Sequence, residues 1–130
     1  MRKLATSLIA LFMSVAFCGG LHAQTDAQSL KNTAWKFYVE PLHDSLVFHI
    51  GSDSSFTTIT TGEVLIRSFC KIEKDTVKIK DYEGQYNCPD GEGVYRYSVE
   101  GDVLSFFLVT DPCSTRAEVL NGVKCKKTPA

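Results

Sequence analysis

The sequence lacks several features that would mark common classes of protein. After residue 23, no apolar run approaches the roughly 18 residues of a membrane-spanning helix, so we expect that part to be soluble. No segment there keeps an amphipathic pattern over the ~12 residues that a stable helix needs, which excludes a helical bundle. Positive charge is not in excess either: 12 basic and 15 acidic residues follow residue 23. The resulting formal charge of −3 argues against binding to nucleic acid.

Motifs for catalysis and metal binding are also missing. The chain has no G-x-S-x-G nucleophile motif, no glycine-rich phosphate loop and no H-E-x-x-H zinc motif. It has no C-x-x-C pair, and His43 and His49 lie far from any cysteine in sequence, which argues against zinc. Asp44 and Ser45 follow His43, but neighbours in a loop rarely form a catalytic set without a third orienting group. We therefore predict a protein that is not an enzyme and uses no metal or cofactor.

The N-terminus has the parts of a secretory signal. A basic start and an apolar run over residues 4–17 are followed by Ala23, a small residue at the cleavage position. The pattern predicts a signal peptide over residues 1–23 and export to the periplasm or the extracellular space. Cys18 supports an alternative, a lipoprotein anchored to a membrane, although bulky Phe17 stands where lipoproteins usually have a small residue.

The rest of the chain has the periodicity of β-strands. A polar segment covers residues 24–33, and a single domain over residues 34–127 alternates apolar and polar residues in short runs between turns. The clearest hairpin covers residues 94–109, while residues 117–120 fit either a strand or a helical turn. Seven or eight such strands predict an all-β, antiparallel up-and-down meander. Curling it into a barrel hides both sheet edges, and a two-sheet sandwich is the alternative.

Four cysteines follow the leader, an even set that predicts two disulfides in an exported domain of this size. Three pairings are possible. Cys88 and Cys113 flank the hairpin at residues 94–109, so both are expected near its open end. This arrangement favours a Cys88–Cys113 bridge, and it leaves Cys70 to pair with Cys125 in a neighbouring strand.

Several motifs resemble those of small extracytoplasmic lipocalin-like domains of the bacterial type. They are a G-x-Y-x-Y stretch over residues 93–97, a hairpin that ends in D-x-C-x-x-R over residues 111–116, and an early Trp35. The resemblance covers roughly residues 30–126. It implies an up-and-down barrel that often holds a cavity for small apolar molecules.

The resemblance also implies structural roles for three residues. In lipocalins an arginine from the end of the chain packs over the early tryptophan, so Arg116 is expected to close the barrel base over Trp35 by a cation–π contact. Asp111 is expected either to cap backbone N–H groups in the turn before Pro112 or to pair with Arg116.

Aromatic residues are numerous for a small domain, and they allow two interpretations. They can fill the core of a small barrel, or they can line a pocket for an apolar ligand. The candidate ligand-binding residues are Phe37, Phe48, Phe56, Tyr95, Tyr97 and Phe106.

These patterns together predict an exported, non-catalytic binding module for a small apolar ligand, held in or at the mouth of a β-barrel. The alternative is a protein-interaction or inhibitor module, with a filled barrel and functional loops over residues 41–46 and 81–93. A large internal cavity would favour the first function, and a solid core with an exposed aromatic patch would favour the second.

Overall fold

A computed structural model describes residues 30–130 of the chain. The predicted signal peptide and Cys18 lie outside the described residues. The elements, in chain order, are β1 (Thr33–Val39), the 3-10 helix η2 (Glu40–Leu42), β2 (Asp44–Ile50), β3 (Ser54–Ile59), β4 (Val64–Glu73), β5 (Thr76–Glu83), β6 (Gly93–Glu100), β7 (Val103–Thr110), α1 (Ser114–Leu120) and β8 (Lys124–Thr128).

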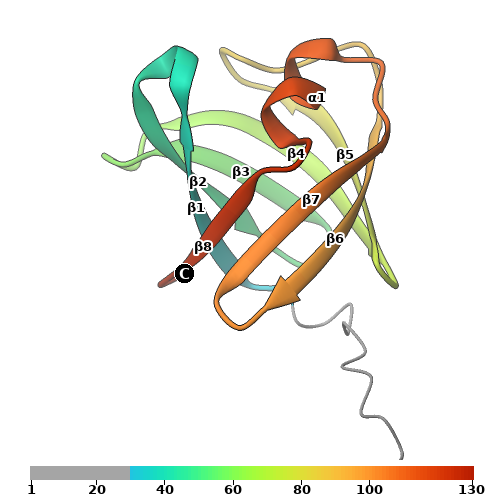
Figure 1. Ribbon diagram of the computed structural model, residues 1–130. Coiled ribbons are helices and arrows are strands. Elements are labelled where there is room, and N and C mark those ends of the chain that lie inside the picture. The colour runs from blue at the N-terminus through green and yellow to red at the C-terminus, as the bar shows by residue number, and fades with distance from the viewer. Residues whose placement is uncertain (1–29) are drawn as a thin grey trace, which may run out of the picture.

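The eight strands form a closed antiparallel barrel in which each strand pairs with its neighbours in sequence (Figure 1). The last strand, β8, closes the barrel by pairing with both β7 and β1. Closure leaves no strand at a free sheet edge, which is the main physical advantage of a barrel over an open sheet. The all-β, up-and-down prediction is confirmed, and the barrel is the correct alternative to a sandwich.

The alternation of side chains explains why these segments form strands around a single interior. In β5, Val77, Ile79 and Asp81 are buried on the inner face, while Lys80 between them faces outward. The hairpin of β6 and β7 turns at Gly101, whose φ of 61° lies in the left-handed region that glycine adopts without strain. The expected hairpin and its turn are therefore confirmed.

Residues 117–120, which fit either a strand or a helical turn in the sequence, belong to the helix α1. The helix α1 begins at Ser114, directly after Pro112 and Cys113, and the Cys113 sulfur accepts a hydrogen bond from the backbone N–H of Arg116. Its Leu120 is buried against the barrel interior. The helix is only seven residues long and lies over one end of the barrel (Figure 1), so it acts as a partial cover for that end.

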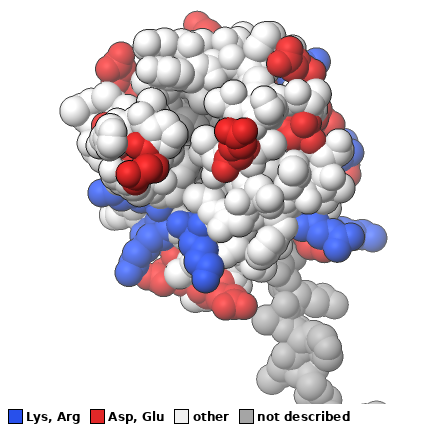
Figure 2. All heavy atoms as spheres, turned by 45° about the horizontal axis from the view of Figure 1, so that its top comes forward, with Lys and Arg blue, Asp and Glu red and all other residues white. Residues whose placement is uncertain are grey.

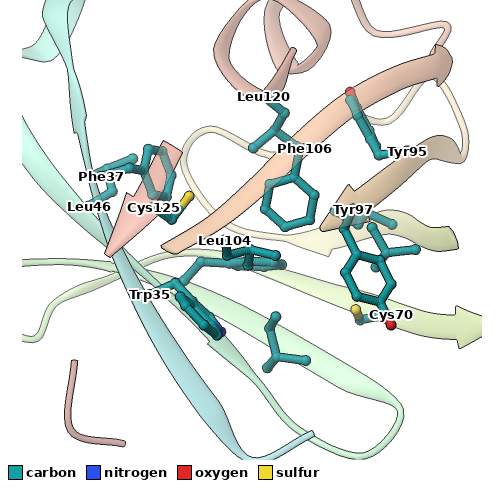
Figure 3. Close-up of a cluster of buried hydrophobic side chains, with 14 of the residues drawn as sticks. Trp35, Phe37, Leu46, Cys70, Tyr95, Tyr97, Leu104, Phe106, Leu120 and Cys125 are labelled. Carbon is teal, nitrogen blue, oxygen red and sulfur yellow. The ribbon is translucent and has the colours of Figure 1, made fainter. Parts of the chain in front are cut away.

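A cluster of packed side chains runs through the barrel interior (Figure 3), from Leu120 of α1 toward the end that carries the β4–β5 and β6–β7 turns. Phe106 is the central ring, with its centroid 6.2 Å from that of Phe48 and 6.4 Å from that of Tyr95, both in edge-to-face geometry. The Tyr97 hydroxyl donates to the carbonyl of Lys74 in the β4–β5 turn. The largest fully buried side chains are Trp35, Tyr95, Phe106, Leu30, Ile50, Leu104, Val77 and Cys125.

The predicted disulfides are half right. Cys88 and Cys113 are bonded, which ties the β5–β6 loop to the start of α1. The predicted Cys70–Cys125 bridge is wrong, because both cysteines are free and buried. Cys70 lies on β4, which pairs only with β3 and β5, whereas Cys125 lies on β8 between β7 and β1. Closing the barrel therefore places the two strands apart, and Figure 3 shows the two sulfur atoms on opposite sides of the core.

Candidate functional site

A buried network of charged side chains lies beneath α1, at the end of the barrel that this helix covers. The side chain of Arg116 is only 8% exposed, and it contacts Asp111, whose side chain is 0% exposed. Arg116 Nε donates to Asp111 Oδ2 at 2.7 Å, and Nη2 donates to Asp111 Oδ1 at 2.8 Å. This is the two-pronged geometry in which arginine binds a carboxylate most strongly.

The arginine has further acceptors on neighbouring segments. Its Nη2 also donates to the carbonyl of Gly91 at 2.8 Å, and its Nη1 lies 3.3 Å from Oδ2 of Asp81. Asp81 in turn accepts from the Ser68 hydroxyl at 2.7 Å and from the backbone N–H of Cys88 at 2.9 Å. The network therefore joins β4, β5, the β5–β6 loop and α1 at one end of the barrel.

The local sequence explains why Asp111 occupies its place. Pro112 ends β7, and the backbone N–H of Cys113 donates to Asp111 Oδ1 at 2.8 Å. The hydroxyl of Tyr95 donates to Asp111 Oδ2 from β6. A side chain at Gly93 would collide with the same carboxylate, so glycine is required there. Asp111 thus fulfils both predicted roles, since it accepts from the turn backbone and pairs with Arg116.

These contacts shift the pKa values of the three central groups. Burial raises the pKa of Asp111, but hydrogen bonds from Arg116, Tyr95 and the Cys113 N–H outweigh burial and hold it below its usual value. Burial, and then the neighbouring Asp111 carboxylate, raise the pKa of the Tyr95 hydroxyl. Burial lowers the pKa of Arg116, but the two aspartates outweigh it and the net shift is upward. The network therefore favours a charged arginine, an ionised Asp111 and a neutral tyrosine.

The lowered pKa of Asp111 predicts a loss of stability in acid. Its pKa is about 3.8 in the unfolded chain and lower in the folded one, so its contribution is present above that pH. The contribution is lost as the pH falls through the folded pKa. We expect the free energy of unfolding, measured by urea titration between about pH 5 and pH 2, to fall steeply in the wild type. The slope should be smaller in Asp111→Asn and unchanged in Asp53→Asn; equal slopes in all three proteins would contradict the prediction.

A cavity of about 590 Å³ opens at this end of the barrel, next to the charged network. Figure 2 turns this end toward the viewer and shows a hollow with acidic side chains on both sides of it. Its inner wall comes from β1 to β5, and its rim comes from η2, the β5–β6 loop and α1. The apolar and aromatic side chains that line it include Phe37, Val39, Leu42, Leu46, Phe48, Ile66, Ile79, Val119 and Leu120.

Small polar side chains on the inner face of β3 and β4 make room for this cavity. Thr57 and Ser68 line it, at positions where a core-filling barrel would carry large apolar residues. Phe56, between two inward-facing residues of β3, points outward instead: it is 37% exposed and stacks on His49 with ring centroids 4.4 Å apart. Phe56 therefore lies on the outer face of the barrel and does not line the cavity, because β3 turns its hydroxyl side chains inward.

The other five predicted ligand-binding residues all belong to the buried core cluster, and only two of them also line the cavity. Phe37 and Phe48 line the cavity. Tyr95, Tyr97 and Phe106 are buried in the packed cluster and are not among the lining residues. The structure therefore places two of the six candidates on the cavity wall.

The expected contact between Trp35 and Arg116 is also wrong. Arg116 binds the two aspartates under α1, whereas Trp35 lies in the filled part of the barrel with its indole N–H donating to the Thr33 hydroxyl at 2.8 Å. Lys127 of β8 takes the expected position instead, with its ammonium nitrogen 5.9 Å from the centroid of the Trp35 ring. The cation over the tryptophan comes from the last strand because β8 pairs with β1 at Trp35 and Lys127.

Sequence analysis missed several cavity residues. Asp81 was detectable, since it follows Val77 and Ile79 at an inward-facing position of the same strand. Glu40, Glu118 and Val119 lie on η2 and α1, and their place at the rim depends on how these short helices pack on the barrel.

Other arrangements and comparisons with known proteins give no further assignment. Among residues 30–130, His43, Asp44 and Ser45 form no assembled set in the contacts seen: the Asp44 carboxylate accepts from the backbone N–H of Ser45. No group of three or more potential ligands in that range is placed to hold a metal ion, and no helix there has the length and hydropathy to cross a bilayer. Comparison with known protein families, with curated proteins and with solved structures found no match. The lipocalin-like resemblance stays a prediction, with which the observed barrel agrees.

Proposed function

We propose that this chain is an exported, non-catalytic module that binds a small apolar molecule in the cavity beneath α1. The observation that carries the proposal is the cavity itself, which at about 590 Å³ falls within the range of about 300–1,000 Å³ typical of ligand sites. Its wall is mainly aliphatic and aromatic, and its polar groups include the buried pair Asp81 and Arg116. Such a surface gains binding energy from removing an apolar ligand from water, while polar groups fix its orientation.

The architecture supports this use of the cavity. The opposite end of the barrel is filled, so the strands have a packed core that holds the cavity wall in place. The Cys88–Cys113 bridge joins two rim segments, the β5–β6 loop and the start of α1. Arg116 connects the same two segments to β5, because it pairs with Asp81 and donates a hydrogen bond to the carbonyl of Gly91. Because the rim is already held in place, less conformational entropy is lost when a ligand binds.

A fluorescent apolar probe tests the proposal directly. N-phenyl-1-naphthylamine should bind the wild type with enhanced emission, and the variant Leu46→Trp/Ile79→Trp, which places two indole rings in the cavity, should bind it at least about tenfold more weakly. The matched control Leu108→Trp/Val109→Trp adds the same two rings at exposed positions of β7 and should bind like the wild type. Equal affinity in the two variants would rule out the cavity as the binding site.

A second candidate function rests on the outer surface. Phe69 is 59% exposed and packs against the exposed Tyr82, with ring centroids 4.7 Å apart, on the outer face of β4 and β5. Exposed aromatic rings of this kind are common in protein interfaces, so an interaction or inhibitor module is the alternative. A wild type that fails to bind the probe, together with a protein partner lost in Phe69→Lys, would favour this alternative.

A further inference from the structure

The charge distribution around the cavity indicates which class of apolar molecule fits it. A buried arginine beside an apolar pocket would ordinarily suggest a carboxylate ligand, such as a fatty acid. Here Arg116 is already engaged, because Asp111 occupies Nε and Nη2, Gly91 also accepts from Nη2, and Asp81 lies against Nη1. The Nη1 atom makes no hydrogen bond but is itself buried, so a ligand in the cavity does not reach it.

The network around that arginine carries an excess of negative charge. One guanidinium is surrounded by two carboxylates whose side chains are at least as buried as its own. Asp81 lines the cavity, and its Oδ1 accepts one hydrogen bond, from Ser68, so that its negative charge lies beside the cavity wall. The polar side of the cavity therefore offers acceptors and no free cation.

The rim adds charge of the same sign. Glu40 on η2 and Glu118 on α1 both line the opening, and Arg116 is the only basic residue among the lining residues. Within residues 30–130, neither glutamate takes part in an ion pair. Figure 2 shows acidic side chains on both sides of the hollow, while lysines and arginines gather lower on the molecule. Apolar walls of low dielectric strengthen the field that such a rim produces inside a cleft.

We infer that the ligand of this cavity is an amphiphilic cation: an apolar body that packs against the Phe37, Leu46 and Phe48 side of the wall, with an ammonium-type group attracted by the negative field of Asp81, Glu40 and Glu118. This inference rests on the proposed function and narrows its ligand class. An anionic amphiphile of the same length would place its head group beside three carboxylates, without a free cation to bind it.

A matched set of twelve-carbon ligands tests the inference. Dodecyltrimethylammonium, 1-dodecanol and dodecanoate have the same chain and differ in head-group charge, and each would compete with N-phenyl-1-naphthylamine below its micelle concentration. We expect the cation to bind at least about tenfold more tightly than the carboxylate at low ionic strength, with the difference shrinking as salt is added. Glu40→Gln/Glu118→Gln should reduce this preference severalfold and leave the affinity for dodecanol unchanged. Glu63→Gln/Glu100→Gln, a matched control away from the cavity lining, should retain the full preference.

The outcomes separate the two proposals. Equal binding of all three ligands, or tighter binding of dodecanoate, would overturn the inference and leave the apolar-ligand function standing. An equal loss of preference in both glutamine variants would also overturn it, because the effect would then come from net charge alone. If neither the probe nor any of the three ligands bound the wild type, the proposed function and this inference would both fail.

Discussion

Replacing Arg116 with methionine is expected to lower the free energy of unfolding by about 3–5 kcal/mol, because it leaves two buried carboxylates without their cation. Methionine keeps much of the length and apolar volume of the arginine stem, so the loss reports the charge rather than a cavity. Urea denaturation at pH 7 with the disulfide intact would measure the change.

Two further variants test whether the loss of stability comes from the buried charges rather than from the removal of any arginine. Arg67→Met removes an exposed arginine that lies 3.7 Å from Glu83, and we expect it to change stability by less than about 1 kcal/mol. The triple variant Asp81→Asn/Asp111→Asn/Arg116→Met removes all three charges and should recover much of the loss, since no unpaired buried charge is left. A single variant as stable as the wild type would show that Arg116 does not hold this end of the barrel together.

Truncating Trp35 to alanine is expected to cost about 3–5 kcal/mol of unfolding free energy. The indole is 1% exposed, packs within the filled end of the barrel and donates a hydrogen bond to Thr33. Removing it would leave a hole among side chains that are already close-packed. Phe69→Ala is the matched control, because it truncates an aromatic ring that is 59% exposed, and it should cost far less. Equal urea midpoints for Trp35→Ala and the wild type would show that Trp35 does not contribute to the packed core.

The two effects belong to different ends of the barrel, and so they should add. Trp35 lies in the packed cluster, whereas the Arg116 side chain lies beneath α1, and the contacts described above for the two side chains share no partner. Free energies of unfolding usually add within about 0.5 kcal/mol for such separated sites. The packed core around Trp35 and the network around Arg116 thus contribute to the free energy of unfolding separately.

The barrel was predictable because its signal is local. Inward-facing and outward-facing residues alternate along the sequence of a strand, as Val77, Ile79 and Lys80 show. The glycine at position 101 indicates the turn of the hairpin. The Cys88–Cys113 bridge followed from the same hairpin, since both residues flank it. The export signal and the fate of Cys18 stay predictions, because they concern residues outside the described part of the chain.

Contacts between distant strands were not predictable in the same way. Pairing Cys70 with Cys125 required knowing that β4 and β8 lie apart in the closed barrel. The pairing of Arg116 with Asp111 was one of the predicted roles of Asp111, but its second partner, Asp81, depended on where α1 lies on the barrel. The inward direction of Asp81, by contrast, was present in the alternation of β5.

The cavity was difficult to predict from the sequence, because it forms where the inner face carries small side chains instead of large apolar ones. Thr57 and Ser68 face inward on strands whose large aromatic residues, Phe56 and Phe69, face outward. The general rule that aromatic rings lie inside a protein therefore misplaces Phe56, and it predicts a barrel interior without room for a cavity. Small hydroxyl side chains at inward positions were the available signal, and they indicate room within a barrel rather than a weakly formed core.

The central claim is that the α1 end of this barrel binds an apolar molecule while the other end is solid. Methyl-detected NMR of the labelled protein, titrated with 1-decanol, would test it most directly. The account predicts saturable shifts at the methyl groups of Leu46, Ile66, Ile79, Val119 and Leu120, which line the cavity, and none at Ile50, Val77 and Leu104 in the packed core. Shifts confined to exposed Leu108 and Val109, or no saturable shift at any cavity methyl, would contradict it.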